Sequence, residues 1–138
     1  MKILMITLIV FAIVSARAVA ADPPKPDTRV FEMRTYYANP GKMADLHARF
    51  RDHTCKLLEK YGMTLIGFWV PTDSKGAEEV LVYIVAHPSE EAAKKAWDAF
   101  RMDPDWIKAR DASEKNGKIL SKPPEVKFFK ATEYSKIK

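Results

Sequence analysis

The sequence has a single cysteine, Cys55, and only five glycines among 138 residues. One cysteine cannot form an internal disulfide, and its place in an apolar helical pattern predicts a buried packing group rather than a nucleophile. The glycines are scattered at turns and form no phosphate-binding loop. HExxH and CxxC motifs are lacking, and His47 and His53 lie about 240° apart around one helix, so they cannot share a metal ion. The sequence therefore predicts no metal and no cofactor, and it identifies no catalytic residue.

The excess of basic over acidic residues is also small. The net charge is +5, and basic residues have acidic neighbours throughout the chain. No stripe of lysines and arginines interleaved with aromatic residues is present, which argues against nucleic acid as a partner.

The first residues resemble a secretion signal. Lys2 precedes an apolar run, and Ala18-Val19-Ala20 is a small-residue cleavage pattern. The run over residues 3–16 has 14 residues, whereas a helix needs about 20 to span the hydrocarbon core. We therefore expect residues 1–20 to be a cleaved signal peptide, the protein to be secreted or periplasmic, and no stable membrane span to remain.

The remaining chain reads as one domain. Residues 21–28 contain three prolines and predict a flexible leader, which places the domain at residues 29–135. Helix caps are expected at Asn39, Ser89 and Asp103, and Gly62 is expected to end the first helix. The predicted order is a strand over 29–38, a helix over 40–61, strands over 63–71 and 79–86 joined by a hairpin turn at 72–76, helices beginning near 89 and 103, and a strand over 126–131. This order indicates an α+β, ferredoxin-like βαββαβ fold, with an antiparallel four-stranded sheet and helices on one face.

Two of these strands are apolar on both faces. The segments 65–70 and 80–85 alternate little between apolar and polar residues, as strands buried on both sides do. Two helices cover only one face of a sheet. A second copy of the same chain is the simplest cover for the other face, which predicts a face-to-face homodimer.

The first strand carries an unusual polar set. Alternation puts Glu32, Arg34 and Tyr36 on one face, and residues 31, 33 and 35 on the face expected to meet the helices. Because this strand is expected in the middle of the sheet, the polar set would lie in the closed space between two subunits. Glu32 and Arg34 would pair there for structural reasons, with each other or across the dimer. Alternatively, Arg34 would present its guanidinium to a ligand carboxylate, with Tyr36 as donor and Glu32 holding the guanidinium in place. His87, on the parity of Tyr83, is a fourth candidate ligand residue at the rim of the same cavity.

Several segments together resemble one family. They are Phe31-Glu32-Met33-Arg34-Thr35-Tyr36 followed by Pro40-Gly41, then Gly67-Phe68-Trp69, then residues 96–106 ending in Asp103-Pro104-Asp105-Trp106, and finally Ala131-Thr132-Glu133-Tyr134-Ser135. In this order and spacing the set resembles the NIPSNAP family, including bacterial members. The resemblance implies a dimeric α/β barrel. Of the family's pattern, it assigns Glu32, Arg34 and Tyr36 on the first strand as candidate site residues, and Trp106 as a structural residue. Related superfamilies include small monooxygenases and haem-using enzymes.

Three functions remain open at this point. The first is an exported NIPSNAP-like homodimer of undefined activity that binds a small anionic or aromatic molecule between its two sheets. The second is a cofactor-free or haem-dependent monooxygenase or isomerase, with Tyr36, His87 or Glu32 transferring protons. The third is a non-catalytic interaction scaffold, which predicts a cavity filled by side chains. Whether the protein is an enzyme is left open.

Overall fold

The computed structural model describes residues 29–138. The predicted signal peptide and the proline-rich leader lie outside the described residues. The strands are β1 (Val30–Tyr37), β2 (Thr64–Trp69), β3 (Val80–His87) and β4 (Glu125–Lys130). The helices are α1 (Met43–Arg49), the π-helical turn η1 (Phe50–Thr54), α2 (Cys55–Lys60), α3 (Ser74–Glu79), α4 (Glu90–Met102) and α5 (Pro104–Ser113).

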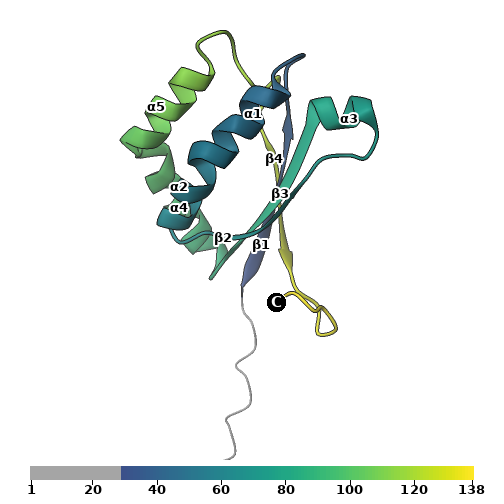
Figure 1. Ribbon diagram of the computed structural model, residues 1–138. Helices are drawn as coiled ribbons and strands as arrows, with labels where there is room; N and C mark the ends of the chain where they lie inside the picture. Colours follow the sequence, from purple (N-terminus) through teal and green to yellow (C-terminus); the bar gives the residue numbers. More distant parts are fainter. Residues whose placement is uncertain (1–28) are drawn as a thin grey trace, which may run out of the picture.

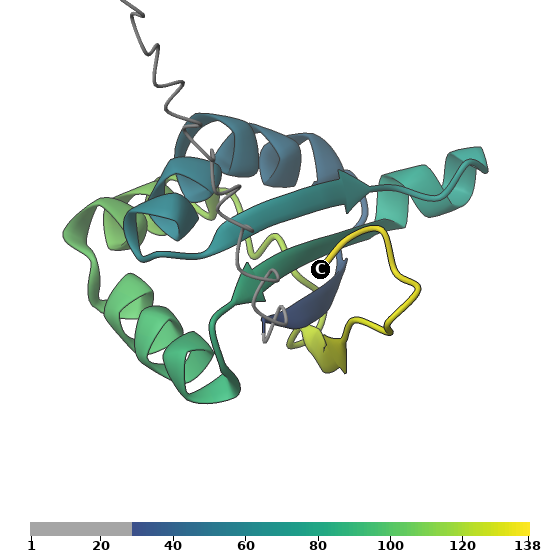
Figure 2. The ribbon, with the colours of Figure 1, turned by 90° about the horizontal axis from the view of Figure 1, so that it is seen from below.

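The strands form one antiparallel sheet in the order β2-β3-β1-β4. Helices α1, α2, α4 and α5 lie on one side of this sheet, while α3 projects beyond the ends of β2 and β3 (Figure 1). The view from below shows the same two layers (Figure 2). The α+β, ferredoxin-like prediction is confirmed, and so is the central position of β1.

Three of the predicted helix boundaries are confirmed, two by capping hydrogen bonds and one by backbone conformation. The side chain of Ser89 accepts from the backbone N–H of Ala92 at the start of α4. The side chain of Asp103 caps α5, where Pro104 occupies the first turn. Gly62 follows α2 with a φ of 77°, a conformation that glycine adopts without strain.

The first helical segment differs from the prediction in two ways. It begins at Met43 rather than at Pro40, because Asn39 does not cap it: the Asn39 side-chain amide donates instead to the carbonyl of Lys118, 3.0 Å away. The segment is also not a uniform α-helix, since η1 inserts a wider π-helical turn at its middle. Hydrophobic spacing alone does not distinguish an α-helix from one with a single widened turn.

The predicted hairpin is confirmed, since β2 and β3 pair antiparallel, but its connection at residues 72–76 is not a simple turn. This segment starts a short helix, α3, in which the side chain of Asp73 accepts from the backbone N–H of Gly76 at 2.7 Å. An aspartate that caps a helix and an aspartate in a turn use the same local hydrogen bond, so the sequence signal for the two is alike.

The core lies between the sheet and the helices. It centres on buried Leu46 and Leu58 from the helices and Tyr83 and Val85 from β3. Phe50 of η1 meets Tyr83 edge to face, with ring centroids 5.1 Å apart. Such contacts hold the π-helical turn against the centre of the sheet.

The polar set of β1 faces the helices, opposite to the prediction. Glu32 contacts Trp97 of α4, and Tyr36 meets Phe50, so residues 31, 33 and 35 lie on the uncovered face. Alternation establishes that the two sets lie on opposite faces, but it does not say which face the helices cover. The prediction assumed that apolar residues would meet the helices.

The uncovered face of the sheet is largely apolar. Strand register places Met33 beside Ile84 on this face, with Val82 and half-exposed Trp69 paired next to them. Phe129 of β4, paired with Phe31, extends the same surface. The helices between residues 29 and 138 therefore leave one hydrophobic face of the sheet uncovered.

Candidate functional site

The most concentrated polar network surrounds the carboxylate of Glu32, which is 0% exposed. This carboxylate accepts hydrogen bonds from Arg34 Nε at 2.6 Å, Trp97 Nε1 at 2.6 Å and His87 Nε2 at 2.7 Å. Since a carboxylate only accepts, Nε2 of His87 carries the proton in this arrangement. Strand register creates the cluster, because His87 of β3 and Glu32 of β1 lie on neighbouring strands and share a face.

Electrostatics keep Glu32 ionised. Burial raises the pKa of this carboxyl, but the hydrogen bond from His87, the charge of Arg34 and the bond from Trp97 together lower the pKa below its ordinary value. A buried charge is tolerated when it is paired and hydrogen-bonded in this way. The sequence-based expectation that Glu32 and Arg34 pair is confirmed within one chain.

Arg34 is held in one position from two sides. The carboxylate of Glu32 accepts a hydrogen bond from its Nε. Its guanidinium carbon lies 3.7 Å from the ring centroid of Trp97, which is a cation–π contact. The side chain is 13% exposed, and its two terminal nitrogens make no hydrogen bond to any residue within 29–138. These two nitrogens form the edge of the guanidinium that binds a planar acid group.

A cavity of about 360 Å³ opens beside Arg34, between the sheet and helices α4 and α5. Its wall is rich in arginine and aromatic side chains. The lining residues are Arg34, Tyr36, Arg49, Trp97, Phe100, Arg101, Trp106, Arg110, Glu114, Leu120 and Pro124. Two of the four predicted ligand residues, Arg34 and Tyr36, therefore line one cavity, which lies within a single chain rather than between two.

Glu32 and His87 lie in the protein interior, beneath the side chains that line the cavity. Both side chains are almost fully buried and neither lines the cavity. The predicted position of His87 at the cavity rim is therefore wrong, because its ring points to the carboxylate of Glu32 inside the protein. Glu32 holds Arg34 in place, as one of the sequence-based alternatives required.

The hydroxyl of Tyr36 has a hydrogen-bond partner in the core. The hydroxyl of Tyr83 donates to the hydroxyl of Tyr36 at 3.0 Å. Burial raises the pKa of Tyr83 well above its ordinary value, so this donor stays protonated. Because Tyr36 accepts this bond, its own proton is directed to another acceptor, and the cavity that it lines supplies the space for one.

Arg49 is the main cavity residue that the sequence did not indicate. It is 4% exposed, and it is the last residue of α1. The following π-helical turn shifts the side chains after it relative to an α-helix. A signal for this turn is not visible in the hydrophobic pattern.

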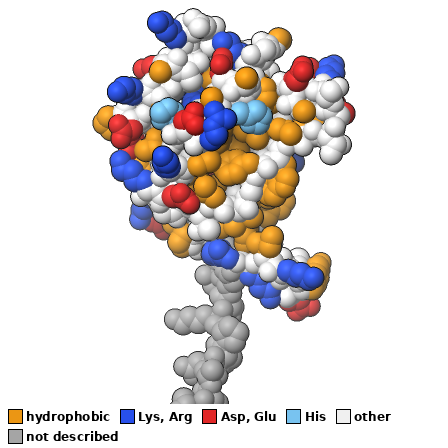
Figure 3. Space-filling view, viewed as in Figure 1, with side chains coloured by type: hydrophobic (Ala, Val, Ile, Leu, Met, Phe, Trp, Pro, Cys, Tyr) orange, Lys and Arg blue, Asp and Glu red, His pale blue; other side chains and the backbone are white. Residues whose placement is uncertain are grey.

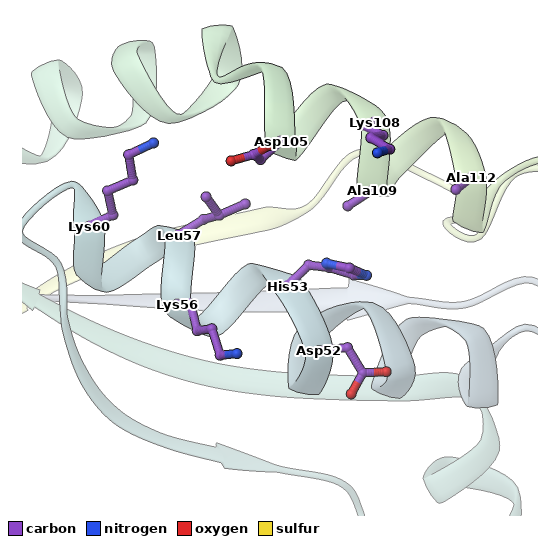
Figure 4. Close-up of a pocket in the computed structure, with 9 residues that line it drawn as sticks. All are labelled: Asp52, His53, Lys56, Leu57, Lys60, Asp105, Lys108, Ala109 and Ala112. Carbon is purple, nitrogen blue, oxygen red and sulfur yellow. The ribbon is translucent and has the colours of Figure 1, made fainter.

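A second hollow, of about 450 Å³, lies between α2 and α5 (Figure 4). Lysines and aspartates line it together, over an apolar floor that includes Leu57 and Ala109. Figure 4 shows Lys56 and Asp52 pointing away from α5, and the amine of Lys60 is already paired with Asp103 at 2.6 Å. These side chains do not converge on one point, so this hollow is a weaker candidate.

A third hollow, of about 570 Å³, follows the outer edge of β2. Phe50, Phe68, Trp69 and Leu81 line it, and Figure 3 shows apolar side chains gathered on this part of the surface. It contains no buried charge that would orient a small ligand. Among residues 29–138 there is also no group of three potential ligand side chains placed to hold a metal ion.

None of the helices between residues 29 and 138 has the length and apolar content that crossing a bilayer requires.

Comparison with known proteins relates the whole folded region to one family. The family model described as NIPSNAP matches residues 31–136. The chain is similar to the crystal structure of a NIPSNAP family protein from Agrobacterium tumefaciens, with a TM-score of 0.68, 15% identity, and coverage of 80% of this chain and 99% of that one. An uncharacterised NIPSNAP-like domain protein from Burkholderia xenovorans gives a TM-score of 0.66 and 16% identity, covering 79% and 90%.

A monooxygenase from Streptomyces coelicolor, solved in complex with the ligand nanaomycin D, is also similar in fold. The TM-score is 0.53 at 16% identity, and the match covers 83% of this chain and 97% of that one. The comparison with curated proteins gave no match.

Proposed function

Because the chain belongs to the NIPSNAP family and presents an immobilised arginine to a cavity, we propose that it binds a small aromatic anion between its sheet and its helices. The observation that carries this proposal is the geometry of Arg34. Its Nε donates to Glu32, its face is covered by Trp97, and its side chain lines the cavity.

Three features of the cavity support an aromatic anion. Arg34 supplies two parallel donors, the arrangement that binds a carboxylate through two hydrogen bonds. Trp97, Phe100 and Trp106 supply an aromatic wall for the body of the ligand. The arginine is already ordered, so binding costs little side-chain entropy.

Benzoate is the simplest probe of this site. We expect it to raise the thermal midpoint of the wild-type protein and to lose this effect in Arg34→Met, which keeps a long apolar side chain but removes the charge. Arg51→Met is the matched control, because Arg51 lies on the surface and, among residues 29–138, pairs with neighbouring Asp52 alone. Equal stabilisation by benzyl alcohol, or by benzoate in Arg34→Met, would contradict the proposal.

An oxygenase acting on an aromatic or quinone-like substrate is the second candidate. The fold shared with the Streptomyces coelicolor monooxygenase favours it, together with Tyr36, the one predicted proton-transfer residue that lines the cavity. With a naphthohydroquinone, this function predicts oxygen uptake above the protein-free rate, and a loss of about 100-fold or more in Tyr36→Phe. Equal rates in Tyr36→Phe and wild type would remove this role for Tyr36.

Two further parts of the proposal concern the assembly and its location. The uncovered apolar face supports a homodimer in which two sheets meet, as in a dimeric α/β barrel.

Residues 1–20 support export to the periplasm or beyond. Amino-terminal sequencing of the protein recovered from a host periplasm tests export, with Ala21 as the expected first residue. An interaction scaffold remains the alternative if no small molecule binds.

A further inference from the structure

The cavity contains a second buried arginine whose contacts are incomplete. Arg49 Nη1 donates to Ser113 Oγ and to Glu114 Oε1, both at 3.3 Å. Its Nε is buried and has no hydrogen-bond partner among residues 29–138. Charged hydrogen bonds normally have lengths of about 2.7–2.9 Å. A buried donor without a partner is unfavourable, so this guanidinium has hydrogen-bonding capacity that residues 29–138 leave unused.

The contrast with Arg34 is clear. Glu32 approaches Arg34 to 2.6 Å and is fully buried, whereas Glu114 is partly exposed and makes only long contacts, including one of 3.4 Å from the backbone N–H of Ile119. Glu114 is therefore a loosely held partner that a better acid group could replace. The remaining cavity arginines, Arg101 and Arg110, lie at the surface and pair with nearby aspartates.

Aromatic side chains connect the two buried arginines. Arg34 lies over Trp97, and the guanidinium carbon of Arg49 is 5.3 Å from the ring centroid of Trp106. Phe100 contacts both tryptophans, with ring centroids 5.3 Å from Trp97 and 4.6 Å from Trp106. Each arginine thus lies at one end of a continuous series of three aromatic rings.

From this arrangement we propose that Arg49 is a second anion anchor, so that the cavity takes an aromatic molecule with two separated acidic groups. This inference rests on the proposed function and narrows its ligand class. One acid group binds the terminal nitrogens of Arg34, the aromatic body contacts the three rings, and the other acid group binds Arg49 in place of Glu114.

Terephthalate and benzoate differ by one acid group and test this inference directly. A naphthalene dicarboxylate with its acids at opposite ends, paired with the corresponding naphthoate, extends the test to a longer ligand. In calorimetric titrations of the wild-type chain, we expect at least one diacid to bind about 10-fold or more tighter than its monoacid, the gain that one charged hydrogen-bonded contact supplies.

Two variants separate the second anchor from the first. Arg49→Met should remove the preference for the diacid, so that the ratio of diacid to monoacid affinity falls to about one. Glu114→Gln, which removes the competing charge, should raise the ratio of diacid to monoacid affinity above that of the wild type. This second variant keeps the test decisive if Arg49→Met fails to fold.

The possible outcomes distinguish the two proposals. If monoacids and diacids bind equally well in the wild type, or if Glu114→Gln leaves the preference unchanged, the second anchor is overturned while binding at Arg34 stands. If neither class binds, both the second anchor and the proposed function are overturned.

Discussion

At the scale of single residues, Glu32 determines the form of the site. Its carboxylate joins β1, β3 and α4 by accepting from Arg34, His87 and Trp97. Removing one member of such a buried charged group leaves the others without a partner, and this costs more than the group itself contributes to stability. Glu32 therefore fixes the position of Arg34 and also stabilises the contact between the sheet and α4.

Glu32→Gln should lower the free energy of unfolding at pH 7 by about 3–5 kcal/mol, because it leaves Arg34 buried without its counter-charge. The folded-state pKa of Glu32 lies below its ordinary value of 4.5. Its contribution is therefore fully present above that value and is lost as the pH falls through the folded-state pKa. The difference between variant and wild type should shrink as the pH is lowered.

Urea unfolding at several pH values between about 7 and 3 measures this effect. Glu125→Gln on exposed β4 is the matched control and should follow the wild type at neutral pH. Acid sensitivity that persists in Glu32→Gln is expected from Asp103. The hydrogen bonds from Lys60 and Tyr61 keep the pKa of that carboxyl well below its usual range. An unchanged difference at all pH values would contradict the role of Glu32.

At the scale of elements, the π-helical turn η1 separates α1 from α2 and places Phe50 on the sheet. It also leaves the hydroxyl of buried Thr54 without a hydrogen-bond partner in the described part of the chain. Widened turns of this kind are frequent at functional sites, and this one directly follows Arg49 in the cavity wall.

Thr54→Val should raise the free energy of unfolding by about 1–2 kcal/mol, because it replaces an unsatisfied buried hydroxyl with a methyl group of similar shape. Chemical denaturation measures the change. Thr54→Ser is the control, since it keeps the hydroxyl and loses the methyl group, and it should be less stable than wild type. A destabilised Thr54→Val would show that the hydroxyl has a partner in solution.

At the scale of the whole molecule, the sheet has one covered and one uncovered face. The uncovered face carries Met33, Val82, Ile84 and Trp69, and contact with a second sheet would remove this apolar area from water. The cavity with Arg34 lies on the other face, so a dimer of this kind leaves both ligand sites separate and complete within their own chains.

Val82→Lys should convert a dimer of residues 21–138 into monomers at micromolar concentration, because it puts a charge into the proposed sheet contact. Val126→Lys is the matched control, since Val126 pairs with Arg34 and therefore lies on the helix side of the sheet. Sedimentation equilibrium measures the mass of each. A monomeric wild type, or dissociation by both variants, would contradict the proposed interface.

The sequence by itself determined the order of the four strands and of the helices that cover the sheet, the caps at Ser89 and Asp103, and the grouping of Glu32, Arg34 and Tyr36 on one face. These features depend on residues close together in the chain, whose spacing reports local geometry. The sequence-based predictions failed at Asn39 and at residues 72–76. In both places, two local hydrogen-bonding patterns have the same sequence signal.

Only the tertiary structure decided which face of β1 meets the helices, and thereby where the cavity lies. Trp97, far along the chain from Glu32, donates to its carboxylate and makes the helix side the favourable place for a buried charge. The same packing brings Arg49 and Glu114 to the cavity. Such contacts arise between residues distant in sequence, and alternation along one strand carries no information about them.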